Sequence, residues 1–471
     1  MECTVLVETT KRQKKKVITP NTPEQDLYLA IERGDLHDVQ VLLERGVDLS
    51  YRLEGWSPLT VACEYGHEEI VDAIVNQLKN DEQNNKRKQR VSDRLNYVSV
   101  LETLNDNGDT PLICAARAGH LDICSLLLES GAYINQTNQH VRQTPLLVAV
   151  EHGHMDVVDF LLDCGADVQL TDNIHITPLY AAIKARNPPM VQRLIQAGCD
   201  VNLGSQDHAP LFLAARLKLL SVVQMLIKAG CNKNITIKYD VTPLYEATFR
   251  GHSDIVEFLV NEECDVNKTD MYGVSPLHIA SMYGHLNCVI LLILGGADMR
   301  LRMQHGQTAL QVAMEMNHAD VVEYFLCRGE DILSKPHGSN SLKIIATVFE
   351  KGHKETVEVL LRGCANLVLL HYPRVTEMFC NNKHLLEMLF MSGIQTIPGV
   401  LTVPKLHPKY VCNPVAAKWL DEYHKKPRSL KALCRIRVRR CLGNKVLCLS
   451  KGLPLPAVVK DYICLGDMYG E

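Results

Sequence analysis

The chain has 471 residues, a formal net charge of −4 and an aromatic content of 6%. This balanced charge and low aromatic content give no whole-chain sign of binding to nucleic acid or to an anionic membrane. The length exceeds what one ordinary hydrophobic core accommodates, yet no shift in composition separates globular domains. A repeat architecture reconciles these observations, because each repeat packs only on its neighbours.

The sequence also predicts an intracellular, cytoplasmic protein. Its longest apolar run, Val289–Leu294, is too short to span a bilayer, and the first residues, Met-Glu-Cys-Thr, lack the charged-then-apolar order of a signal peptide. The 17 cysteines are scattered without a C-x-x-C pair, which is typical of buried thiols in a reducing compartment. Neither membrane insertion nor a metal site is expected.

Residues 1–23 are predicted to be a flexible basic tail, because they contain the charged run Lys11-Arg-Gln-Lys-Lys-Lys16. After this tail, Leu27–Asp48 has the pattern of a worn helical repeat, with Ala30 and Gly34 at repeat-equivalent positions. Its polar outer face is expected to cap a stack of repeats.

A Thr/Ser-Pro-Leu-type motif then marks the start of each repeat. Its hydroxyl caps the first helix, and its proline occupies the first turn, where the missing amide has no effect. Glycines such as Gly119 end that helix, and a histidine follows. A second helix carries paired apolar residues such as Val157 and Val158, which are expected to face the next repeat. The motif begins at Ser57, Thr110, Thr144, Thr177, Ala209, Thr242, Ser275 and Thr308, with successive differences of 53, 34, 33, 32, 33, 33 and 33 residues.

This period and this motif resemble the ankyrin repeat. The resemblance implies an all-α repeat solenoid of helix-turn-helix units joined by β-hairpin loops. About ten or eleven repeats are expected over residues 24–393. The last two, Ser341–Cys364 and Val375–Gly393, keep the helical pattern but lose the Thr-Pro-Leu start. A linker over residues 394–425 follows, and it is punctuated by Pro398, Pro404, Pro408 and Pro414.

Residues 79–99 form an insertion of about twenty residues over the normal period. The polarity of this segment favours disorder. Together with Lys11–Lys16, its basic run Lys86–Arg90 leaves nuclear import open as an alternative role.

Partners of ankyrin proteins usually contact the hairpin tips and the exposed end of the first helix, which lie four, three and one residues before each motif and seven and eight after it. In the repeats that begin at Thr242 and Ser275, these positions are unusually apolar and aromatic, as expected of an interface centre. Packing against a neighbouring hairpin or a returning C-terminal segment is the alternative. The predicted substrate-binding residues are Tyr239, Phe249, Arg250, Met271, Tyr272, Met282 and Tyr283, with Trp56 as a weaker second candidate.

Earlier repeats place polar residues at the same positions, and these are expected to be ordinary wetted surface. They are Asp106, Asn107, Asp109 and Arg117 in one repeat and His140, Gln143 and Glu151 in the next.

Near the C-terminus, an apolar residue recurs every four positions from Leu430 to Leu442, which predicts one apolar stripe on a helix. Arginines fill much of the remaining circumference, so the stripe needs a groove on another protein or on the repeat stack. Two prolines then hold Leu453–Pro456 extended, before Val459 and Tyr462 return to helical spacing.

These two motifs make residues 426–466 resemble a SOCS box, with residues 467–471 as a short tail. Ser450 departs from the family, which usually has an apolar residue three positions before the first leucine of the Leu-Pro-Leu-Pro motif. A terminal capping hairpin without a partner is the alternative. The resemblance implies that elongin C, with elongin B behind it, binds Leu430, Leu433, Cys434, Val438 and Leu442. It also implies that a cullin of the cullin-5 type, with its RING protein, is selected by Leu453, Pro454, Leu455, Pro456, Val459 and Tyr462.

No catalytic residue, metal ligand or cofactor is predicted. No nucleophile elbow, phosphate loop, H-E-x-x-H or paired-acid signature occurs. The arginine-rich helix lacks interleaved aromatic residues, so nucleic acid is not expected as a partner. The repeated histidines occupy one position per repeat, which favours a structural role. They are His67, His120, His154, His252 and His285.

Repeats and box together predict a non-catalytic substrate receptor of an elongin B/C cullin-RING ubiquitin ligase, with an unknown protein substrate. Two alternatives stay open, because ankyrin repeats serve many functions. One is a scaffold or sequestering adaptor whose box only stabilises the fold, and the other is a nuclear ankyrin cofactor that uses the basic segments.

Overall fold

The computed structural model describes residues 22–88, 100–204, 208–329, 347–348 and 351–363. Within these ranges the chain forms α-helices and one 3-10 helix but no strand, so the all-α prediction is confirmed. None of the described helices has the length and hydropathy that a membrane span requires. The chain divides into two compact units, residues 1–204 and 205–471, which are described separately.

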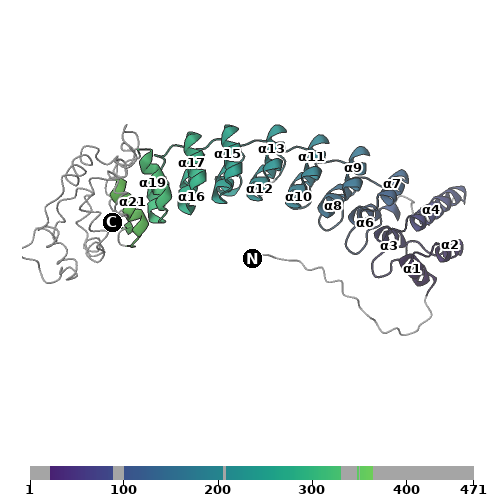
Figure 1. Ribbon diagram of the computed structural model, residues 1–471. Coiled ribbons are helices and arrows are strands. Elements are labelled where there is room, and N and C mark those ends of the chain that lie inside the picture. Colours follow the sequence, from purple (N-terminus) through teal and green to yellow (C-terminus); the bar gives the residue numbers. More distant parts are fainter. Residues whose placement is uncertain (1–21, 89–99, 205–207, 330–346, 349–350, 364–471) are drawn as a thin grey trace, which may run out of the picture. The chain divides into compact units, whose positions relative to one another are not determined.

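The first unit is a row of antiparallel helix pairs (Figure 1). The first helices of successive pairs pack on one another from α1 to α10, and the second helices do so from α2 to α9. The helices are α1 (Pro23–Arg33), α2 (Leu36–Glu44), α3 (Pro58–Tyr65), α4 (Glu68–Lys88), α6 (Pro111–Ala118), α7 (Leu121–Glu129), α8 (Pro145–His152), α9 (Met155–Asp163), α10 (Pro178–Lys184) and α11 (Pro188–Gln196).

The second unit repeats this arrangement, with first helices stacked from α12 to α18 and second helices from α13 to α21. A short 3-10 helix, η1 (Lys238–Asp240), lies in one hairpin loop. The helices are α12 (Pro210–Arg216), α13 (Leu220–Lys228), α14 (Pro243–Phe249), α15 (Ser253–Asn261), α16 (Pro276–Tyr283), α17 (Leu286–Leu294), α18 (Ala309–Glu315), α19 (Ala319–Cys327) and α21 (Lys354–Gly363).

Each first helix begins at the predicted motif. The Thr110 hydroxyl, for example, accepts a hydrogen bond from the Ile113 amide at 3.3 Å, while Pro111 occupies the first turn. Ala209 has no hydroxyl and provides no side-chain cap. Thr22 caps α1 in the same way, so this helix starts at Pro23, one residue before the predicted boundary of the repeats.

Loops between the helix pairs are hairpin turns rather than strands. Asp270 N–H donates to the Val274 carbonyl at 3.0 Å within one turn, and Met271 N–H donates to the Tyr239 carbonyl of the preceding turn at 3.0 Å. A single β-bridge, Leu53 to Trp56, occurs among the described residues. Backbone hydrogen bonds therefore close each hairpin and also connect it to the adjacent hairpin.

The histidines after the first helices join neighbouring repeats. The His154 ring donates from Nε2 to the Arg117 carbonyl at 2.8 Å. Gly119 adopts φ +81°, and a Cβ there would lie 2.5 Å from His154 Nδ1. Glycine is therefore required at this position both for its backbone conformation and for the ring beside it. This contact gives His154 a structural role.

The prediction that the insertion at residues 79–99 is disordered is partly wrong. Helix α4 continues to Lys88, so the first half of the insertion extends this helix. The segment has no glycine or proline, and Gln77 donates to Asp81 at 3.2 Å, one turn later. Residues 89–99 lie outside the described part of the chain.

Gly119→Ala should destabilise the chain more than Gly165→Ala. Both glycines have positive φ, +81° and +85°, so alanine at either position carries a strain of roughly 1–2 kcal/mol. Only at Gly119 does the new methyl also collide with a histidine ring, which adds an overpacking cost of about 1–3 kcal/mol. Urea-unfolding midpoints of the two variants check this. Equal midpoints would show that the His154 contact contributes nothing.

Candidate functional site

The second unit brings three of the predicted aromatic residues to exposed positions of two successive repeats. Tyr239 is 62% exposed, Tyr272 54% and Tyr283 47%. We call this set the aromatic patch, and it comprises Tyr239, Phe249, Arg250, Met271, Tyr272, Met282 and Tyr283.

Part of the aromatic patch is held rigidly by contacts between its own members. The Phe249 and Tyr283 rings meet edge to face, with centroids 4.9 Å apart and planes at 89°. The Arg250 guanidinium carbon lies 5.3 Å from the Phe249 ring centroid, and its Nε donates to Glu246 at 3.0 Å. Neighbour packing therefore accounts for the half-buried Phe249 but leaves Tyr239 and Tyr272 exposed.

Asp270 positions the hairpin tip that carries Met271 and Tyr272. Its carboxylate accepts hydrogen bonds from the Tyr272 and Val274 amides, both at 2.8 Å. The Tyr245 hydroxyl donates to the other carboxylate oxygen at 3.3 Å. Burial, followed by the nearby Asp270 charge, raises the pKa of Tyr245, so this phenol stays protonated and donates. The sequence analysis missed Asp270 because it lies outside the five tip positions.

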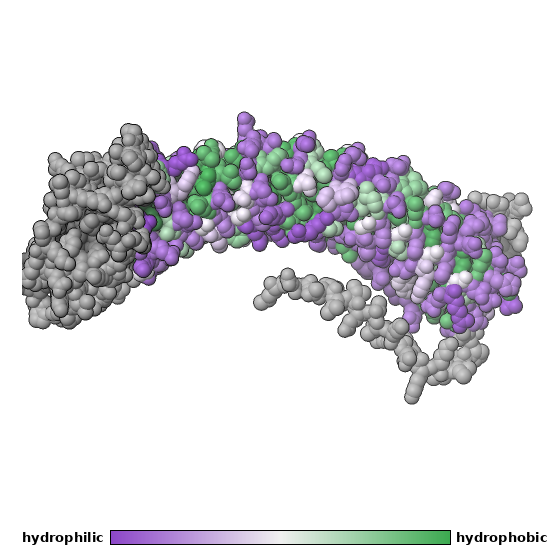
Figure 2. Space-filling view, viewed as in Figure 1, coloured by the Kyte–Doolittle hydropathy of each residue, from purple (hydrophilic) through white to green (hydrophobic). Residues whose placement is uncertain are grey.

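In the second unit, Met316 and Leu294 are also exposed apolar residues that the sequence-based prediction did not include. Met316, eight residues after Thr308 and thus equivalent to Tyr283, is 48% exposed and extends the patch by one repeat. The same offset in the sequence would have found it. On the other side of the repeats, Leu294 of α17 is 65% exposed, and Figure 2 shows hydrophobic surface over this helix.

Trp56 lies in the first unit, whereas the other predicted substrate-binding residues lie in the second. Its side chain is half-buried, and its carbonyl accepts a hydrogen bond from the Tyr28 hydroxyl. Burial raises the pKa of Tyr28 to about 12. Together with the bridge to Leu53, these contacts give Trp56 a structural place in the first hairpin.

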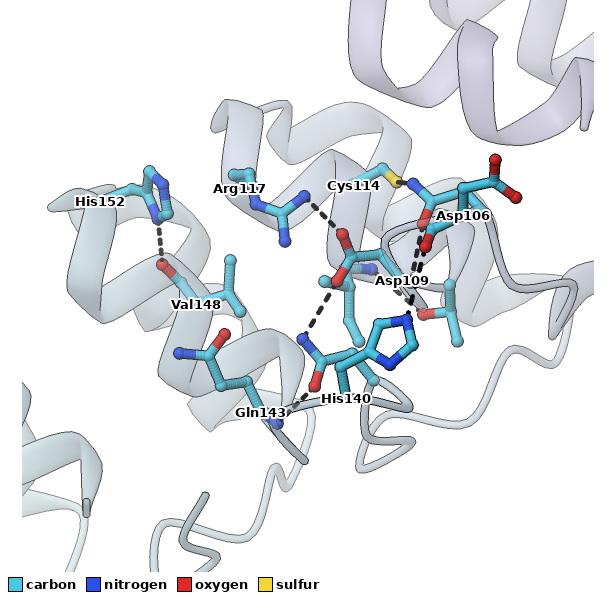
Figure 3. Close-up of polar contacts among 12 residues, drawn as sticks. Asp106, Asp109, Cys114, Arg117, His140, Gln143, Val148 and His152 are labelled. Atoms are coloured by element: carbon cyan, nitrogen blue, oxygen red, sulfur yellow. Dashed lines mark hydrogen bonds and ion pairs between the residues drawn. The ribbon is translucent and has the colours of Figure 1, made fainter. Parts of the chain in front are cut away.

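The first unit carries a buried polar network where wetted surface was predicted (Figure 3). Asp109 is only 1% exposed and pairs with Arg117 at 2.7 Å. Asn138 of the next hairpin donates to the other Asp109 oxygen at 3.1 Å, and the Asn105 side chain accepts from the Asp109 amide at 2.8 Å. The prediction was wrong for Asp109 because the adjacent hairpin covers it.

Glu64 lies beside this network. Burial raises the pKa of its carboxyl, and the Arg117 charge opposes that shift. Its Oε2 is buried and has no hydrogen-bond partner within the described ranges. An ionised Glu64 is therefore poorly solvated in the folded chain.

Within the described ranges, no group of three His, Cys, Asp or Glu side chains converges to hold a metal. Burial raises the pKa of Cys124 to about 12 and that of Cys63 well above its usual value, so these thiols stay protonated and unreactive.

Two family models match the chain. The model described as ankyrin repeats (3 copies) covers most of it, at residues 12–88, 94–172, 146–237, 211–303 and 290–369. The model described as SOCS box matches residues 426–464. The chain belongs to the ankyrin repeat and SOCS box family.

Among solved structures, the crystal structure of the human ASB11 ankyrin repeat domain is 25% identical to this member of the family. The matched region covers 47% of this chain and 90% of the ASB11 chain, with a TM-score of 0.39. Ankyrin repeats followed by a SOCS box are the organisation of a substrate receptor for elongin BC–cullin ubiquitin ligases, an adaptor role that is generally non-catalytic. Every residue predicted to contact elongin or cullin lies outside the described part of the chain.

Glu64→Gln should stabilise the chain at pH 7 and have no effect near pH 4. Because folding raises the pKa of Glu64, the folded chain binds more protons than the unfolded chain between the two pKa values, so the free energy of unfolding falls as pH rises through this window. Glutamine does not titrate, so the variant lacks this pH-dependent loss of stability. Melting temperatures of wild type and variant from pH 4 to 8 check the prediction, with the exposed Glu32→Gln as control. A lower melting temperature than wild type at pH 7 would contradict the prediction.

Proposed function

We propose that this chain is the substrate-recognition subunit of a cullin-5-type elongin B/C cullin-RING ubiquitin ligase. The observation that carries the proposal is the SOCS box match at residues 426–464, C-terminal to ankyrin repeats that match as far as residue 369. The chain would bind the substrate protein and position it, while its partners would carry out ubiquitin transfer.

Elongin C would bind the apolar stripe of the box, from Leu430 to Leu442. A helix with one narrow stripe and an otherwise arginine-rich circumference gains stability when a partner groove covers the stripe. The extended Leu453–Pro456 segment, followed by Val459 and Tyr462, would contact the cullin. Its prolines fix the backbone before binding, which lowers the entropy lost on association.

The aromatic patch would bind the substrate protein. Its exposed tyrosines and methionines supply apolar contact area, and the Asp270 contacts hold the hairpin tip in place before a partner arrives. Holding the substrate near a charged ubiquitin-conjugating enzyme raises the effective concentration of its lysines at the reacting thioester.

The double variant Leu430→Asp/Cys434→Arg should lose elongins B and C in affinity purification, because it places charge in the apolar stripe. Mass spectrometry of the captured proteins checks this. Tyr239→Asp/Tyr272→Asp is the matched control, since it should keep both elongins and lose substrate proteins. If wild type captures no elongin while its repeat-dependent partners persist, the chain acts as a scaffold or sequestering adaptor.

Leu453→Ala/Pro454→Ala/Pro456→Ala should keep the elongins but lose the cullin, because the substituted segment follows the elongin-binding stripe. Immunoblots of the same captured complexes for cullin-5 and cullin-2 identify the type. Recovery of cullin-2 in place of cullin-5 would contradict the proposed cullin type and leave the receptor role intact.

A further inference from the structure

A basic edge adjoins the aromatic patch in the second unit. We define it as Arg216 and Lys218 together with Arg250, which the edge shares with the patch; all three are exposed at the C-terminal ends of the first helices α12 and α14. Arg216 lies seven residues after Ala209 and is thus equivalent to Phe249 and Met282 of the patch. The same row of positions therefore changes from basic to apolar along successive repeats.

The charges of the basic edge converge on one imidazole, that of His252. Burial lowers the pKa of His252 and the Lys218 and Arg250 charges lower it further, while its hydrogen bond to the Arg216 backbone and the Asp254 carboxylate oppose the shift. Arg250 also contacts Phe249, which places positive charge directly against the apolar rings.

Lys218 is held in a backbone conformation that favours glycine. Its φ is +60°, and it occupies the position that Gly251 and Gly284 fill in the following repeats. Arg186 and Asn317 hold the same position in their own repeats, with φ +55° and +63°, so a side chain in this conformation recurs along the stack. The conformation places Lys218 directly after the end of its first helix, beside Arg216.

Within the described ranges, no ion pair gives Arg216 or Lys218 a carboxylate partner. Arg250 pairs with Glu246 through Nε alone. Arginine presents several N–H donors in one plane, which matches a carboxylate in two-point contact. The edge is thus complementary to acidic side chains.

We infer that the aromatic patch and the basic edge together bind an acidic peptide segment of the substrate, in which an aromatic or aliphatic side chain is flanked by Asp or Glu. The apolar side chain packs against Tyr239, Tyr272 and Tyr283, and the carboxylates face Arg216, Lys218 and Arg250. This inference rests on the proposed function, because it names the class of substrate for the same surface.

Labelled peptides with a common Tyr-Leu-Phe core flanked by Glu, Gln or Lys test the inference. Fluorescence anisotropy measures their binding to the full chain purified with elongins B and C. The Glu peptide should bind roughly tenfold tighter than the Gln peptide, as expected for close charge pairs, and this advantage should shrink as salt is added. The Lys peptide should bind weakest.

The variant Arg216→Glu/Lys218→Glu should reverse the order and favour the Lys peptide. Its matched control is Lys228→Glu/Arg300→Glu, which makes the same change in net charge at exposed positions on α13 and after α17 and should keep the order. Tyr239→Asp/Tyr272→Asp should lose the peptides. Melting temperatures identify any variant that fails to fold.

Equal affinity for the Glu and Gln peptides, or the same loss of preference in the control variant, would overturn the inference. Elongin capture by the same preparations is scored separately. If elongins bind and the Glu preference is absent, the acidic substrate class is wrong and the receptor role stands. If the preference is present without elongin capture, the receptor role is wrong and the peptide-binding surface stands.

Discussion

Each helix pair in this chain leaves an apolar face open, so the fold depends on stacking one pair on the next. The buried pairs Val157–Val158 and Val222–Val223, all at most 1% exposed, show how completely the second helices use their apolar face. The contact between Gly119 and His154 adds a polar link between adjacent pairs and demands glycine on one side of it. These requirements recur in many repeats, which is why the sequence has a fixed period.

Stacking constrains the interior but leaves the hairpin tips and first-helix ends free to vary. The two units use this freedom differently. In the first, Asp109 is buried and paired with Arg117 at one hairpin, while Tyr65 and Ile174 are exposed in other repeats. A buried ion pair of this kind adds little net stability but fixes the position of its members. In the second, Tyr239 and Tyr272 stay exposed on tips that backbone hydrogen bonds hold in register.

Under the proposed function, recognition and recruitment occupy separate parts of the chain. The repeats would select the substrate, and the SOCS box would connect it to elongins and a cullin. Such an adaptor needs rigid presentation rather than reactive groups, and the buried, protonated thiols of Cys63 and Cys124 accord with this. Lys218, which like Arg186 and Asn317 replaces the glycine after its first helix, lies beside the surface proposed to bind substrate.

The sequence alone determined the helical repeats, the start of each first helix and the tip positions that carry Tyr239 and Tyr272, because period and capping are local properties of the chain. It also contained the signal for Met316, at an offset already in use. Only the tertiary structure decided that Asp109 is buried while Val274, at the same offset, is half-buried. That difference depends on which side chains the adjacent hairpin supplies, and Asn138 comes from a different repeat. Offsets from a motif place a residue in its own repeat, whereas burial is set by its neighbours.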